Sequence, residues 1–145
     1  MAGAAAAVAA ADAVATWDDV RRLVAALPGT DEHASYVGLP SWRVAGKAFV
    51  WERPLGASDL AALGDAAPAG DVPLLGVRVA DEGEKRALLR GDPRVFLTTP
   101  HFDGYPVVLV RLDRVADAVL AELVEDAWRD RAPRRLLAER ATGRR

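Results

Sequence analysis

The chain has 145 residues, of which 51% are hydrophobic and 28% charged, a balance that fits one compact domain with its own apolar core. The formal net charge is −2, and the absence of cysteine excludes disulfide scaffolds, zinc–thiolate sites and thiol nucleophiles. No apolar run reaches the roughly 18 to 20 residues that cross a bilayer, so we expect a cytoplasmic protein with no membrane partner.

Residues 1–15 are almost all small and apolar, which gives them a superficial likeness to a secretion signal. They contain no basic residue and no leucine, and Asp12 interrupts them, so the basic and leucine-rich regions of such a signal are missing. We therefore expect 1–15 to form an alanine-rich flexible tail in front of the folded domain.

The first helix is predicted to begin after Thr16 and to end at Pro28-Gly29. Thr16 is a good N-cap, and acidic residues follow it in the first turn, where the helix dipole favours negative charge. Apolar residues recur at spacings of three and four, which places one stripe on the core: Trp17, Val20, Val24 and Leu27.

Strands follow, the first around residues 33–38 and the next two as a hairpin over 39–53. Ala45-Gly46 supplies the hairpin turn. Simple alternation on either side of that turn predicts one large apolar face: Trp42, Val44, Phe49 and Trp51.

The second half of the chain reads as a loop, a strand, a helix, a second hairpin and two final helices. The segments concerned are 54–73 with a helical turn at 58–63, 74–80, 81–91, 95–113 about Asp103-Gly104, 114–133, and 133–140. Prolines flank the turn of the second hairpin, and proline donates no ladder hydrogen bond, so this end of the hairpin should lie at a sheet edge or a bulge.

This order of elements predicts an α+β fold, a two-layer sandwich in which the N- and C-terminal helices pack on one face of an antiparallel sheet. We expect the folded domain to span 16–140 and a basic tail to follow at 141–145. One core shared by sheet and helices should contain Trp17, Leu27, Phe49, Val79, Val110, Leu123 and Trp128.

Three segments resemble the MmcQ/YjbR-like family, and together they span residues 16 to about 137. They are "LPGTDEHASY…LPSWRVAGKAFVWE" after Trp17, "DPRVFLTTPHFDGYPVVLV" and "ELVEDAWRDRAPRRLL". The resemblance implies a frataxin-like (CyaY-like) sandwich. It also implies a DNA-binding role through a double wing of β-hairpins, by analogy of shape.

One position departs from the family pattern, which commonly has Gly-Trp where this chain has Gly104-Tyr105-Pro106. An aromatic ring is kept there, so a packing role is preserved. A ligand contact that depended on the tryptophan would not carry over.

The residues that suit phosphate contact are five basic side chains, in the first hairpin and at the start of the last helix: Arg43, Lys47, Arg53, Arg134 and Arg135. Residues 130–145 hold six arginines against two acidic residues. DNA affinity depends largely on such residues, but dedicated binders tend to be basic overall. With a net charge of −2, any DNA binding should be weak and sensitive to salt.

Catalysis and metal binding find little support in the sequence. The two histidines, His33 and His101, lie far apart and without a neighbouring nucleophile-and-base pattern, so we expect His101 to be a hydrogen-bonded structural residue. No spaced ligand cluster points to a metal or other cofactor. The acidic first-helix ridge with which frataxins meet iron does not carry over, because arginines offset Asp18 and Asp19.

Three functions follow from these observations. The leading one is a non-enzymatic DNA-binding protein that contacts phosphates through basic hairpin wings. The alternative is an adaptor that binds a protein or a small ligand on the open face of the sheet, and the third is an enzyme built on His101. A continuous basic stripe through Arg43, Lys47 and Arg53 favours DNA, scattered charge favours the adaptor, and a deep polar pocket at His101 favours the enzyme.

Overall fold

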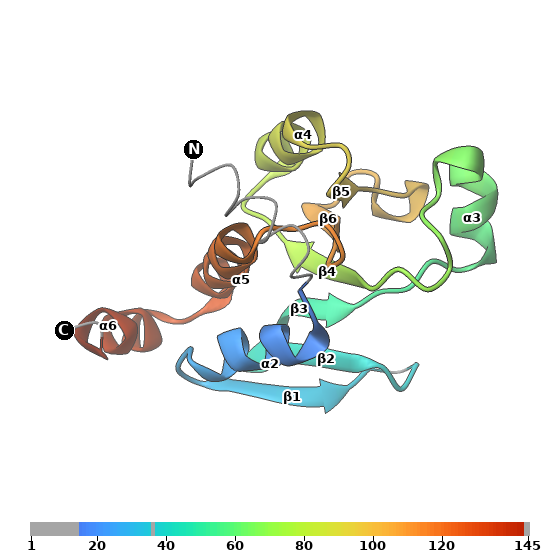
Figure 1. Cartoon of the computed structure of the whole chain (residues 1–145). Helices are drawn as coiled ribbons and strands as arrows, with labels where there is room; N and C mark the ends of the chain where they lie inside the picture. The colour runs from blue at the N-terminus through green and yellow to red at the C-terminus, as the bar shows by residue number, and fades with distance from the viewer. Residues whose placement is uncertain (1–14, 36, 144–145) are drawn as a thin grey trace, which may run out of the picture.

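The structure, a computed structural model, describes residues 15–35 and 37–143 (Figure 1). Its helices are α2 (Trp17–Ala25), α3 (Ala57–Leu63), α4 (Glu82–Gly91), α5 (Asp117–Arg131) and α6 (Arg134–Gly143), with 3-10 turns η1 (Gly64–Ala66) and η2 (Pro100–Phe102). Its strands are β1 (Thr30–Ala34), β2 (Pro40–Val44), β3 (Lys47–Glu52), β4 (Leu74–Arg78), β5 (Phe96–Leu97) and β6 (Val107–Arg111).

The six strands form one antiparallel sheet in the order β1-β2-β3-β4-β6-β5. Helices α2 and α5 pack against each other, and their buried residues share one cluster with β2, β3, β4 and β6. We call the sheet face that they cover the front face and the opposite one the back face. The fold class predicted from the sequence is confirmed.

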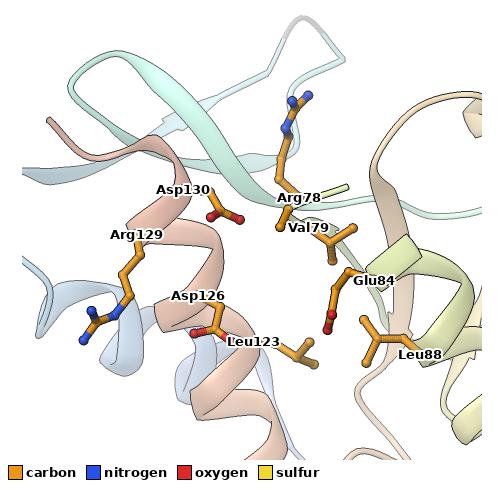
Figure 2. A pocket seen from close by; sticks show the side chains of 9 residues that line it. Arg78, Val79, Glu84, Leu88, Leu123, Asp126, Arg129 and Asp130 are labelled. Carbon is orange, nitrogen blue, oxygen red and sulfur yellow. The ribbon is translucent and has the colours of Figure 1, made fainter. Parts of the chain in front are cut away.

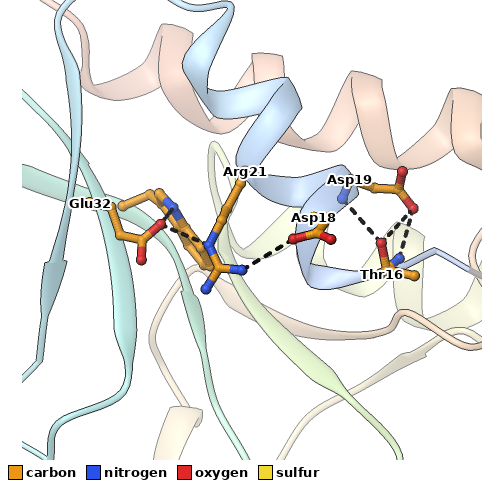
Figure 3. Close-up of polar contacts among 6 residues, drawn as sticks. Thr16, Asp18, Asp19, Arg21 and Glu32 are labelled. Atoms are coloured by element: carbon orange, nitrogen blue, oxygen red, sulfur yellow. Dashed lines mark hydrogen bonds and ion pairs between the residues drawn. The ribbon is translucent and has the colours of Figure 1, made fainter.

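Helix α2 begins with a reciprocal cap. The Asp19 backbone N–H donates to Thr16 Oγ1 at 3.2 Å, and the Thr16 N–H donates to Asp19 Oδ2 at 2.8 Å (Figure 3). The backbone hydrogen bond from Thr16, together with Arg22, lowers the pKa of the Asp19 carboxyl. The predicted N-cap is therefore confirmed, and it satisfies backbone donors that a helix start leaves free.

A second contact fixes α2 to the sheet. The rings of Trp17 and Trp42 stack with their centroids 6.2 Å apart. Trp42 Nε1 donates to Glu32 Oε1 at 2.9 Å, and Arg21 Nε reaches the same oxygen at 3.1 Å, the second contact being drawn in Figure 3. The Trp42 ring can be fully buried because its one polar atom has a partner.

The prediction that Trp42 and Trp51 share a face is wrong. Trp42 pairs with Val50 and Arg43 with Ala48, so the register shifts by one residue between them. This bulge lets the consecutive residues Phe49 and Val50 both enter the front-face core. Beyond it, Trp51 lies opposite Ser41 and belongs to the cluster on the back face. A one-residue slip reverses every later side chain, which simple alternation from the turn does not anticipate.

The first strand also differs from its prediction, since β1 spans Thr30–Ala34 rather than 33–38. Its first four residues are polar, most of the strand is exposed, and its limits follow the ladder that pairs Thr30 with Val44 and Ala34 with Pro40. Edge strands commonly carry exposed polar residues, so apolar alternation is a poor guide here. The second hairpin does end at a sheet edge, as predicted, because β5 is the outermost strand.

The predicted core is confirmed: six of its seven residues are buried in the main cluster and Trp17 packs against it. At the C-terminal end, Trp128 Nε1 donates to the Pro28 carbonyl at 3.0 Å. Ala15, predicted to belong to the tail, is buried, and its N–H donates to the Leu112 carbonyl. Helix α6 includes 141–143, while the tail prediction for 1–14 lies outside the described residues.

Candidate functional site

The back face is crossed by a single row of paired residues, one from each of the six strands: His33, Ser41, Trp51, Gly76, Leu109 and Leu97. Helices α2 and α5 do not cover this face, and connecting segments pack on it instead. Phe102 of η2 packs there with Val107 and Leu109, and Trp51 and Leu55 lie against them half-buried.

The Trp51 ring lies against Gly76 in the middle of this row. A Cβ atom added to Gly76 would come within 2.6 Å of Trp51 Cε2 and 2.7 Å of Nε1, closer than side-chain carbons approach other atoms. The missing side chain at Gly76 is what lets the indole rest on the backbone of β4. Trp51 is thus the floor of whatever space lies above the sheet at this point.

That space is a groove of about 610 Å³, which we call the back-face groove. Its walls come from Ser35, Val37 and Leu39, from residues 53–59 and from η2. The side chains that line it include Leu39, Trp51, Arg53, Leu55, His101 and Phe102. Its volume falls within the roughly 300 to 1,000 Å³ of small-molecule sites, which are concave and mostly apolar with a few placed polar groups.

Arg53 is the main cation of the groove, and it is firmly held. Its Nη1 donates to Asp59 Oδ2 at 3.1 Å and also to the Pro54 carbonyl, and its Cζ lies 5.2 Å from the centre of the Phe102 ring. Burial acts to raise the pKa of Asp59, but the Gly56 N–H and the Arg53 guanidinium outweigh it, so the pKa is lowered. The two residues form a charged pair at neutral pH.

His101 does not match its prediction. It is exposed, and within the described residues it makes no hydrogen bond. Its ring contacts Phe102 edge-on, with the centroids 4.9 Å apart, beside the groove that it helps to line. The prolines and the tight turn around it favour a hydrogen-bonded residue, but these features restrain the backbone and leave the imidazole free.

Lys85, which the sequence reasoning missed, holds η2 in place. It is buried, and its Nζ donates to the carbonyls of Phe102 at 2.6 Å and Tyr105 at 2.9 Å, with Glu82 Oε1 4.0 Å away. Its spacing from Leu88 and Leu89 places it on the inward side of α4, a signal that was present in the sequence. Asp59 was missed as well, and its only sequence signal was its third position after Gly56 at a helix start.

The five predicted phosphate contacts are not brought into one stripe. Arg43 donates to Asp31 Oδ1 at 2.9 Å, and Arg53 is paired with Asp59. Lys47 is exposed where β3 begins, about 20 Å along the strand from Arg53. The charge is therefore scattered in the first hairpin.

Three of the five nevertheless gather at one end of the molecule. The Ala45 N–H in the hairpin turn donates to the Gly29 carbonyl at 3.4 Å, and Leu136 of α6 packs directly over Gly29. Figure 1 shows α6 beside the loop that joins α2 to β1, while α3 lies at the opposite side. We call Lys47, Arg134 and Arg135, all exposed, the basic end.

A second cavity, of about 230 Å³, lies between β4, α4 and α5 (Figure 2). Arg78, Glu84, Asp126 and Asp130 border it above an apolar wall that includes Leu88. Burial, with Asp126 adding to it, raises the pKa of Asp130, and burial with the nearby Arg131 lowers that of Arg78.

Within residues 15–35 and 37–143, no group of three or more His, Cys, Asp or Glu side chains is placed to hold a metal ion. In the same part of the chain, no helix has both the length and the apolar character needed to span a bilayer.

Comparisons with known proteins agree with this fold. The family model YjbR matches residues 25–130. Uncharacterized proteins of Mycobacterium tuberculosis (Rv2570) and Mycobacterium bovis (Mb2600) are each 50% identical to the chain over 127 residues, covering 86% of it and 94% of their own length. The crystal structure of Deinococcus radiodurans protein DR2400, with a DUF419 domain, has a TM-score of 0.60 and 17% identity, covering 88% of this chain and 89% of that one.

Proposed function

The chain belongs to the YjbR family, and from its back-face groove we propose that it is a non-enzymatic protein that binds a ligand there. The observation that carries the proposal is the groove itself, in which an aromatic floor and a held arginine lie together on the face left free by α2 and α5. Sites of this kind bind small molecules or short segments of a partner.

The arrangement of charge supports this function over a basic wing. Of the three basic residues in the first hairpin, Arg43 and Arg53 already face carboxylates. The charge of each guanidinium is already balanced by Asp31 or Asp59, so neither residue adds the uncompensated positive charge from which DNA affinity largely comes. Scattered and neutralised charge is what we expect of an adaptor.

The environment of His101 favours binding over catalysis. A catalytic imidazole is commonly oriented by a hydrogen-bond partner, and within the described residues the His101 ring makes an edge-on contact with Phe102 and no hydrogen bond. The groove around it is lined mainly by apolar side chains. We therefore assign His101 the role of a polar contact at the groove wall.

The test is to titrate the ¹⁵N-labelled protein with a set of small aromatic fragments and to follow backbone NMR shifts. Binding should shift residues 51–59 and 101–102. The Ala57→Trp variant fills the groove wall and should abolish these shifts, whereas Ala62→Trp, on an exposed position of the same helix outside the groove, should leave them unchanged. Shifts confined to other surfaces, or equal binding by both variants, would contradict the proposal.

The basic end supports a second candidate, weak contact with nucleic acid. Lys47, Arg134 and Arg135 are exposed, have no ion pair within the described residues, and lie around the same loop. Such a surface would bind phosphates without reading sequence.

A further inference from the structure

Resting on the proposed function, we infer that the ligand of the back-face groove is a small monocarboxylate with a flat apolar body. Its carboxylate would pair with the free edge of Arg53, and its body would lie across Trp51 and Phe102.

The first step of the argument is the way Arg53 is bound. Both of its hydrogen bonds leave from Nη1, one to Asp59 and one to Pro54. Nε and Nη2 have no acceptor in the described residues, and neither is among the buried atoms that lack a partner. These two nitrogens form the edge of the guanidinium that binds a carboxylate through two parallel hydrogen bonds.

The second step is that the groove offers donors and few acceptors. Oδ2 of Asp59 already accepts from the Gly56 N–H and from Arg53, and Thr99 interacts with the same carboxylate. Glu52 borders the groove, but its register opposite Leu75 directs it to the front side of the sheet, away from Trp51. Acceptors on the ligand would therefore meet the arginine edge and, nearby, the His101 imidazole.

The tryptophans add a third donor. The indole N–H of Trp42 donates to Glu32 and that of Trp128 to Pro28, whereas those of Trp17 and Trp51 have no acceptor within the described residues. Of these last two, Trp51 is the one that borders the groove. An indole that borders a groove with its N–H unused suits a ligand that carries oxygen atoms.

The last step concerns charge and shape. Arg53 and Asp59 form a pair of net zero charge, which exerts little long-range attraction on an anion, so an anionic group would be held by the short, paired hydrogen bonds of the free arginine edge. A planar carboxylate matches that edge. The Trp51 and Phe102 rings, with Leu39 and Leu55 beside them, match a flat apolar body.

The experiment is isothermal titration of the protein with 2-naphthoate and with 2-naphthamide, which has the same body but no charge. We expect naphthoate to bind about tenfold more tightly than naphthamide, because only the anion can make the charge-assisted pair. Arg53→Lys keeps the charge but loses the paired edge, so it should remove most of this preference. Arg43→Lys, which alters an ion-paired arginine of the same hairpin outside the groove, should retain it.

Equal affinity for the two probes, or an unchanged preference in Arg53→Lys, would overturn the inference. If fragments still bound in the groove and lost binding in Ala57→Trp, the proposed function would stand and only the ligand class would be wrong. Should Arg53→Lys fail to fold, as judged by its thermal transition, the comparison of the two probes on the unaltered protein decides the matter alone.

Discussion

The two faces of the sheet have the same strands and opposite properties. On the front face, Trp42 and Trp128 are fully buried and each indole N–H has an acceptor. On the back face, Trp51 is half-buried, lies against a glycine and, within the described residues, keeps its N–H unused. Trp42 and Trp51 come from the two strands of one hairpin, and the bulge sends them to different faces. The buried residues of the front face therefore stabilise the fold, whereas the back face leaves side-chain groups available to a ligand.

The largest effect that would test this difference is expected from Trp128→Ala. Removing a fully buried tryptophan leaves a cavity and should lower the free energy of unfolding by about 3 to 5 kcal/mol. Urea denaturation would measure it. Trp51→Ala is the matched change on the back face and should cost clearly less, because part of that ring is already in contact with solvent. Equal losses in the two variants would remove the distinction between the faces.

Gly76→Ala should have the next largest effect, and it acts on the back face alone. The new methyl group would meet the Trp51 ring at 2.6 Å and force it off the sheet, at a cost of about 1 to 3 kcal/mol. Fragment binding in the groove should disappear with it. In a Trp51→Ala background the same change should be nearly neutral, a coupling that a double-mutant cycle measures. Additive effects of the two substitutions would contradict the close approach of ring and strand.

A smaller effect is expected from the pH dependence of the Arg53–Asp59 pair. The pKa of Asp59 is lowered by folding, so its contribution to stability is fully present above the ordinary value of 3.8 and is lost as the pH falls through the lower value of the folded state. Asp59→Asn should therefore be less stable than the unaltered protein near pH 6 and should approach it in stability once the pH falls below the lowered pKa of Asp59 in the folded state. Parallel stability curves for the two proteins would show that the pair contributes nothing.

The smallest effect on stability is expected at the basic end, a surface that belongs to neither face of the sheet. Replacing Lys47, Arg134 and Arg135 by alanine should change stability by no more than about 0.5 kcal/mol per site, because all three are exposed. If this end meets DNA, the slope of log K against log salt should flatten by about 0.9 for each phosphate that the variant no longer neutralises. Salt-titrated binding to duplex DNA measures that slope. An unchanged slope would leave the basic end as ordinary solvated charge.

The sequence predicted the front face well because large apolar residues at helical or strand spacing are buried for one physical reason. Trp128 and Leu123 needed no knowledge of their partners to be placed in the core. The prediction for the back face failed at Trp51, because a bulge in β3 changes which side of the sheet a residue faces and leaves no mark in local composition.

The groove could not be assembled from the sequence for a related reason. Trp51, Asp59 and His101 come from three separate segments, and their meeting depends on how η2 and α3 fold back over the sheet. Lys85, which holds η2 through two carbonyls, acts on the backbone and so offers no complementary side chain to look for. The exposed state of His101 follows from that same loop path.

The close contact between Trp51 and Gly76 has a consequence for how this sequence can vary. An indole at one position requires hydrogen as the side chain at the other, since even a methyl group would overlap the ring. Substitutions at the two positions are therefore coupled. A larger residue can be accepted at 76 only after Trp51 has been replaced by a small residue, and the reverse order passes through a strained intermediate. Across related genes, a residue larger than glycine at 76 should occur only together with a small residue at 51.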